Sequence, residues 1–140
     1  MGFKIMIADD DVFIVRVVSG ILKSHGYWVV TASDALQANM VARREKPDLI
    51  LMDFRMPAGD GLKVYENLQK ASGLGATPVV FMSSDTSEEL KSKALALGAV
   101  DFLTKPFDDV MLIETIRRVL GETQLPEQPG PPESGSQSPG

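Results

Sequence analysis

The chain has 140 residues, 44% of them hydrophobic and 24% charged, which is typical of one globular domain. It contains no cysteine, which excludes disulfides, zinc–thiolate sites and thiol nucleophiles. The net charge is −5, and residues 121–140 carry three acidic side chains and no basic one, so the rest of the chain is close to neutral. Such a charge distribution argues against direct binding of nucleic acid.

The N-terminus lacks the basic and apolar layout of a signal peptide, and no apolar run approaches the roughly 18 residues of a membrane span. We therefore expect a cytoplasmic protein without a membrane partner.

Short apolar segments alternate five times with segments of helical pattern. In chain order, the strands are expected near residues 3–8, 27–31, 48–52, 78–83 and 99–104. Helices are expected over residues 12–25, 34–46 and 61–71, from the capping pattern at 86–89 to Gly98, and from Asp108 to Gly121. The second helix carries Leu36 and Met40 at helical spacing. Five such βα units in series predict a doubly wound parallel sheet with right-handed crossovers.

The pattern stops at Gly121. Five Pro, four Gly and three Ser fall within residues 121–140, a composition that does not support a packed element. We expect residues 1–120 to form the domain and residues 121–140 to be a disordered tail or a linker.

Carboxylates follow two of the expected strands. Asp9, Asp10 and Asp11 end the first apolar run, and Asp53 ends the third. The carboxyl ends of parallel strands share one edge of the sheet, where ligand sites form. Clustered carboxylates raise the pKa of at least one member unless a cation is present, and such a ligand set suits Mg²⁺. The alternative is that Asp9 to Asp11 only cap the first helix.

A hydroxyl and a lysine follow the other two strands that reach this edge. Ser83 ends the fourth strand, and Lys105 follows the fifth. A hydroxyl donor and a cation there would bind the oxygens of a phosphoryl group on Asp53. Taken singly, Ser83 is explained by a turn or a helix cap, and Lys105 by ordinary exposure. The combination predicts a phosphoryl site.

The chain resembles the receiver domain of two-component response regulators over about residues 3–120. The matching motifs are Ile7-Ala8-Asp9-Asp10-Asp11, Asp53 to Gly61, Pro78 to Ser84 and Gly98 to Phe107. The resemblance implies a flavodoxin-like (βα)5 fold and phosphoryl transfer to Asp53. It further implies that Mg²⁺ is bound by Asp9, Asp10, Asp53 and the backbone carbonyl of Arg55.

The same resemblance implies a readout. Ser83 and Lys105 would bind the phosphoryl group, and Phe102 would move inward as Ser83 moves. Phe102 is also explained as a core aromatic of the fifth strand. The expected partners are a sensor histidine kinase or phosphotransfer protein, and a downstream target or C-terminal output domain. Arg55 and Asp85 are expected to pair at the mouth of the site and to slow autodephosphorylation.

Two other functions are considered. An aspartyl-phosphate hydrolase would carry a second Asp two residues after the nucleophile, but this position holds Arg55. A phosphorylation-independent binding module would not need the five residues Asp9, Asp10, Asp53, Ser83 and Lys105 together. The expected protein is therefore a signalling domain that promotes only its own phosphorylation and dephosphorylation, not an enzyme.

Overall fold

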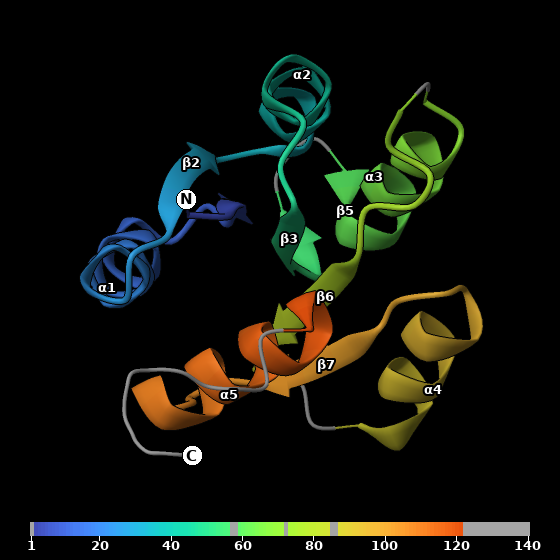
Figure 1. The fold of residues 1–140 in the computed structure, drawn as a ribbon. Helices are drawn as coiled ribbons and strands as arrows, with labels where there is room; N and C mark the ends of the chain where they lie inside the picture. Colours follow the sequence, from blue (N-terminus) through green and yellow to red (C-terminus); the bar gives the residue numbers. More distant parts are fainter. Residues whose placement is uncertain (1, 57–58, 72, 85–86, 122–140) are drawn as a thin grey trace.

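The fold is that of a computed structural model, which describes residues 2–56, 59–71, 73–84 and 87–121 (Figure 1). The predictions for Asp85, for Thr86 and for the tail beyond Gly121 fall outside the described residues. Among the described helices, none is long and apolar enough to cross a membrane.

Five parallel strands form one sheet in the order β2-β1-β3-β6-β7, as predicted. Each of the three central strands is apolar on both sides, which matches a sheet covered by helices on both faces. The sequence did not predict the short antiparallel pair β4–β5 that follows β3. The strands are β1 Lys4–Ala8, β2 Trp28–Ala32, β3 Leu49–Asp53, β4 Arg55–Met56, β5 Gly59–Asp60, β6 Val79–Ser83 and β7 Asp101–Thr104.

Each described helix lies close to its expected range. The helices are α1 Val12–Ser24, α2 Ala35–Glu45, α3 Gly61–Gln69, α4 Glu88–Ala96 and α5 Asp109–Leu120. Carboxylates or hydroxyls cap the N-termini of four of them, because these side chains accept hydrogen bonds from amides that lack a partner within the helix. The caps are Asp11, Asp34, Ser87 and Asp108.

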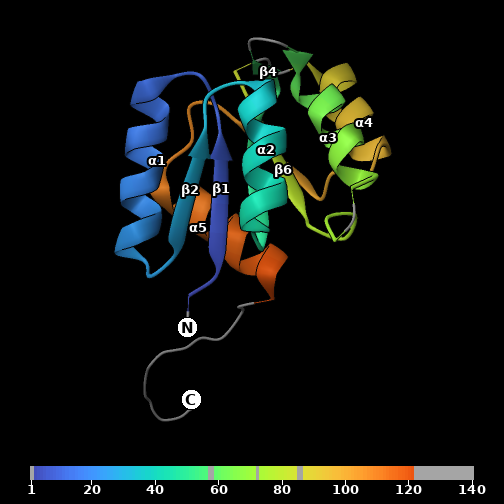
Figure 2. The same cartoon turned by 90° about the horizontal axis from the view of Figure 1, so that it is seen from above.

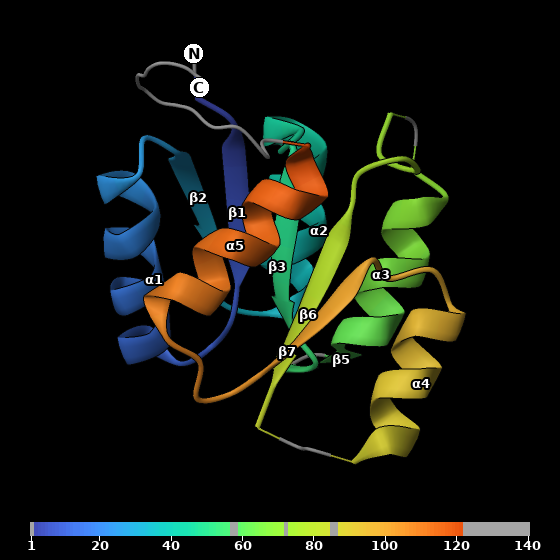
Figure 3. The ribbon, with the colours of Figure 1, turned by 60° about the horizontal axis from the view of Figure 1, so that its bottom comes forward.

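The helices form two layers around the sheet (Figures 1 and 3). One apolar cluster joins the sheet to α1 and α5, and includes Ile5, Leu51 and Leu112. The other joins the opposite face to α2, α3 and α4, and includes Met52 and Phe81. The sheet is therefore buried on both faces, as the alternation of elements predicted.

The apolar pair on α2 is not part of this core. Leu36 is 72% exposed and Met40 is 56% exposed, so they form the outer stripe of the helix. The inner face is made of small residues, chiefly Ala38 and Ala42, which let the helix lie close to the sheet. The large side chains gave the stronger apolar signal but point away from the core.

The strands and helices run in opposite directions (Figure 2). The side of the sheet where the strands end therefore differs in charge from the side where they begin. Carboxylates gather where the strands end and the helices begin, at Asp9, Asp11, Asp53 and Asp108. Basic side chains occupy the last turns of the helices, at Lys23, Arg43, Arg44, Lys93, Arg117 and Arg118. Both arrangements complement the helix dipoles.

Replacing Gly98 with Ala is expected to destabilise the protein more than replacing Gly26 with Ala. Both glycines have positive φ, of 112° and 88°, and such backbone strain costs about 1–3 kcal/mol at either position. At Gly98 the added Cβ would also lie 2.5 Å from Tyr65 Oη, whereas at Gly26 it would meet no atom within 4 Å. Urea denaturation measures the difference. Tyr65→Phe, which removes the hydroxyl, should recover part of the additional loss, and equal losses at the two glycines would contradict this account.

Candidate functional site

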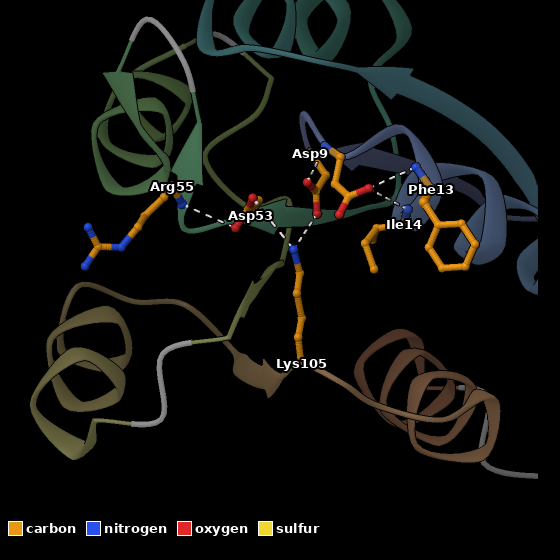
Figure 4. A network of polar contacts seen from close by, with 7 residues as sticks. Asp9, Phe13, Ile14, Asp53, Arg55 and Lys105 are labelled. Atoms are coloured by element: carbon orange, nitrogen blue, oxygen red, sulfur yellow. Dashed lines mark hydrogen bonds and ion pairs between the residues drawn. The ribbon is translucent and has the colours of Figure 1, made fainter.

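The predicted site residues converge where the strands end (Figure 4). Asp9 directly follows β1, Asp53 is the last residue of β3, and Ser83 is the last residue of β6. Lys105 follows β7, and its amide donates to the carbonyl of Ser83 over 2.7 Å. The parallel register of β3, β6 and β7 thus brings together residues that lie far apart in the sequence.

Asp9, Asp10 and Asp53 form a carboxylate cluster, with one oxygen from each lying within 4.8 Å of the others. Asp9 is 1% exposed, Asp53 is 9% exposed, and Asp10 lies open to solvent. Asp9 Oδ1 also accepts a hydrogen bond of 2.9 Å from the amide of Asp11. Asp11 itself caps α1, so the capping explanation holds for this one residue.

Lys105 supplies positive charge between two of these carboxylates. Its Nζ lies 2.7 Å from Asp9 Oδ2 and 3.7 Å from Asp53 Oδ2. The sequence predicted that Lys105 would pair with a phosphoryl group, but it did not predict the short ion pair with Asp9. The Asp9 side chain is fully buried, and burying a carboxylate is costly unless it is paired, so the contact with Lys105 stabilises the fold.

Asp53 is the carboxylate whose protonation the site alters most. Burial and the neighbouring Asp9 raise its pKa from an ordinary 3.8 to about 6, although Lys105 and the Arg55 amide act in the opposite direction. The Arg55 amide donates to Asp53 Oδ1 over 3.3 Å. A cation placed beside Asp53 would therefore stabilise its ionised form.

The cluster fits a magnesium ion. Mg²⁺ prefers hard oxygen ligands and binds through one or two carboxylates while keeping waters or phosphate oxygens. Asp9, Asp10 and Asp53 offer oxygens of this kind at one point, and exposed Asp10 leaves the cluster open to solvent. Burial, followed by the charge of Asp9, raises the pKa of Asp53, and a cation bound beside it would oppose both effects. The predicted role of the Arg55 carbonyl as a further ligand stays a prediction.

Ser83 and Phe102 lie on the two neighbouring strands β6 and β7. Ser83 is 4% exposed at the end of β6, next to Thr104 of β7. Phe102 is 7% exposed and belongs to the core cluster that contains Phe54 and Phe81. Its ring thus lies in the interior of the protein, which agrees with the explanation as a core aromatic. A switching role for Phe102 stays a prediction.

The sequence analysis missed the contribution of Phe54, the residue that follows Asp53. Its ring packs edge-on against Phe81 at 5.6 Å between centroids, and lies 6.4 Å from Phe102. Phe54 therefore fixes the backbone beside Asp53 to the apolar interior. A single aromatic after a strand carries no distinctive signal, so only the packing reveals this role.

The Arg55 side chain extends away from Asp53 and Lys105 (Figure 4). It is exposed to solvent, and its predicted partner Asp85 lies outside the described residues. The pairing of Arg55 and Asp85 therefore stays a prediction.

The sequence matches a known family along most of its length. Residues 5–117 match the response regulator receiver domain. The chain is 35% identical over 117 residues to protein PilH of Pseudomonas aeruginosa, which covers 84% of this chain and 97% of PilH. It is 34% identical over 125 residues to the transcriptional regulatory protein PhoP of Bacillus subtilis, covering 89% of this chain but 51% of PhoP. The chain thus spans about half the length of this second relative.

Solved structures agree with the sequence match. The fold superposes on the chemotaxis response regulator CheY4 of Vibrio cholerae with a TM-score of 0.81 and 33% identity, covering 85% of this chain and 99% of CheY4. It also matches the receiver domain of the sensor histidine kinase PA1611 from Pseudomonas aeruginosa, with a TM-score of 0.80, 28% identity and coverage of 86% and 99%. That structure holds a magnesium ion in its active-site cleft. This chain belongs to the response regulator receiver domain family of two-component signal transduction.

Proposed function

We propose that Asp53 accepts a phosphoryl group from the phosphohistidine of a sensor histidine kinase or phosphotransfer protein, with Mg²⁺ bound at Asp9, Asp10 and Asp53. Receiver domains are signalling domains and not enzymes in general, and this family binds Mg²⁺ in its active site. The observation that carries the assignment to Asp53 is its place between an acidic cluster and Lys105 at the end of β3.

The transfer is a displacement at phosphorus. An oxygen of ionised Asp53 forms a bond to the phosphorus while the bond to the donor imidazole nitrogen breaks, and the imidazole retains the electron pair. Asp53 must be ionised to attack, and a pKa of about 6 leaves most of it ionised at neutral pH. The product is an acyl phosphate, whose hydrolysis returns the carboxylate. Self-phosphorylation and self-dephosphorylation of this kind are part of the proposal.

The charges of the site favour this reaction. The transferred group carries negative charge on its equatorial oxygens, so catalysis depends on positioning and on nearby positive charge. A bound Mg²⁺ would neutralise charge on the carboxylates and on the phosphoryl oxygens. Lys105 can exchange its contact with Asp9 for one with the phosphoryl group, because its Nζ already lies 3.7 Å from Asp53. The hydroxyl of Ser83 would donate a hydrogen bond to the same phosphoryl group.

The surface beside the site supports docking of a protein donor. Val12 and Phe13 begin α1 next to the carboxylate cluster, and they are 70% and 71% exposed. Such apolar side chains favour contact with a protein surface. The downstream partner, whether a separate target or an attached output domain, and the cytoplasmic location belong to this proposal as well.

The test is intact mass after incubation with acetyl phosphate and Mg²⁺. The expected result is one phosphoryl adduct, lost on addition of EDTA and absent from Asp53→Asn. Asp34→Asn is the matched control, because Asp34 caps α2 and is not one of the three clustered carboxylates, and Asn also caps helices. This variant should be phosphorylated like the parent chain.

An adduct that persists in Asp53→Asn would move the acceptor to another residue. No adduct in a folded chain that binds Mg²⁺ would contradict the proposal and favour the phosphorylation-independent module.

A further inference from the structure

Trp28 is the only tryptophan of the chain, and it is the first residue of β2. Its side chain does not join the core, since it is 67% exposed on the edge strand of the sheet. Val30, two residues further, packs against the apolar cluster under α2. Side chains alternate along a strand, so Trp28 lies on the same face as Val30, beside the end of α2. A large aromatic surface is thus left open where the strands begin.

The helix ends on this side of the sheet are rich in basic side chains, although two acidic residues that contact Lys4, Glu45 and the exposed Asp48, also lie there. The last turns of α1, α2 and α5 lie at the end of the sheet where the strands begin (Figure 2). Asp53, the last residue of β3, lies at the opposite end. Lys4 is the register partner of Trp28 and pairs with Glu45, which Arg44 also contacts. The exposed basic residues at the ends of α1 and α2 are Lys23, Arg43, Arg44 and Lys46.

The chain leaves the domain at this same edge. Leu120, the last residue of α5, and Phe3, which precedes β1, both pack against the apolar cluster between the sheet and the helices α1 and α5. The carbonyl of Phe3 accepts a hydrogen bond of 2.9 Å from the amide of Trp28. A polyproline II segment rises about 3.1 Å per residue, so ten residues cover about 30 Å. A five-stranded sheet is only about 20 Å wide. Trp28 lies on the face opposite α5, so the segment has to pass around the starts of the strands, and residues 122–132 are long enough to do so.

The composition of that segment complements this surface. Residues 126–132 contain two overlapping Pro-x-x-Pro patterns, at Pro126 to Pro129 and at Pro129 to Pro132. Such sequences favour polyproline II and are recognised by exposed aromatic rings. Residues 122–140 also carry Glu122, Glu127 and Glu133 and no basic residue. An acidic, proline-rich segment therefore leaves the domain beside a basic edge with an open tryptophan.

We propose that residues 126–132 dock on Trp28 of the same chain as a polyproline II segment, with Glu122 and Glu127 facing the basic helix ends. The stacking of proline rings on the indole of Trp28 provides apolar contact. Attraction between the two glutamates and the basic helix ends directs the segment to the end of the sheet where the strands begin. This docking surface lies away from Asp53, so the proposal does not depend on phosphorylation.

The test uses contact quenching of a bimane label by tryptophan. Because the chain has no cysteine, Gln128→Cys gives a single labelling position in the full chain. The expected result is a loss of bimane emission relative to the same labelled chain carrying Trp28→Phe, independent of protein concentration. A label at Ser138→Cys, beyond the docking segment, should lose less emission. Raising the salt from 0.1 M to 1 M shortens the Debye length from about 10 Å to about 3 Å and should restore part of the emission.

A second variant keeps Trp28 and changes the four prolines at 126, 129, 131 and 132 to Ser. Its emission should rise to the level of the Trp28→Phe chain, and unchanged quenching would overturn the polyproline contact. Equal emission with and without Trp28 would overturn the docking altogether. Quenching that grows with protein concentration would overturn docking within one chain and assign the contact to the tail of a second copy.

Discussion

Replacing Asp53 with Asn is expected to stabilise the metal-free protein at pH 8 by up to about 3 kcal/mol, a value that follows from the shift of the Asp53 pKa from 3.8 to about 6. The ionised carboxylate is buried beside Asp9, and the positive charge of Lys105, 3.7 Å away, compensates for this only in part. The Asn side chain keeps an oxygen that can accept the hydrogen bond from the Arg55 amide, but it carries no charge.

The effect has a defined pH dependence. A carboxyl group whose pKa is raised by folding binds its proton more readily in the folded state, so the stability of the parent chain falls as pH rises from about 4 to about 6. Above that range the parent chain should be less stable than Asp53→Asn by a constant amount. Below it the parent chain and Asp53→Asn should be equally stable. Urea denaturation in EDTA across this range measures the difference. A difference that does not change with pH would contradict the account.

Binding of Mg²⁺ provides a second test of the buried charge on Asp53. Adding the ion at pH 8 should stabilise the parent chain more than Asp53→Asn, because a ligand that binds only the folded state raises its stability. Equal stabilisation of both chains would indicate that Asp53 is not a ligand.

Replacing Lys105 with Met is expected to destabilise the protein by about 3 kcal/mol, the lower end of the cost of breaking a buried ion pair. Asp9 has a fully buried side chain, and its Oδ2 lies 2.7 Å from Lys105 Nζ. Met fills a similar volume but leaves the Asp9 charge with no counter-charge from Lys105. Thermal or urea denaturation of the metal-free chain measures the loss.

Two comparisons make this prediction specific. Lys91→Met removes a surface ion pair, at 3.9 Å from Glu88, and should cost no more than about 0.5 kcal/mol. Asp9→Asn combined with Lys105→Met removes both charges and should recover much of the stability lost in Lys105→Met alone. If the double variant is no more stable than Lys105→Met, the loss comes from packing and not from the buried charge of Asp9.

The order of the elements and the convergence of the site were predictable from local patterns. Apolar runs that end on Asp9, Asp53, Ser83 and Lys105 are visible without coordinates, and parallel βα units bring strand ends to one edge. The apolar spacing of Leu36 and Met40 predicted the α2 helix but did not reveal which face of it is buried. Alanines carry little apolar signal, so the exposed Leu36 and Met40 dominated the pattern although Ala38 and Ala42 face the sheet.

The sequence by itself determined the fold class, the five strands of the sheet and the set of residues at its carboxyl edge, because periodicity and strand endings are local properties. Only the tertiary structure decided which of these residues contact one another. The pairing of Lys105 with Asp9, the raised pKa of Asp53, the burial of Phe102 against Phe54 and the exposure of Trp28 all depend on distances between elements far apart in the chain. Electrostatic and packing energies change steeply with such distances, and a residue pattern does not contain them.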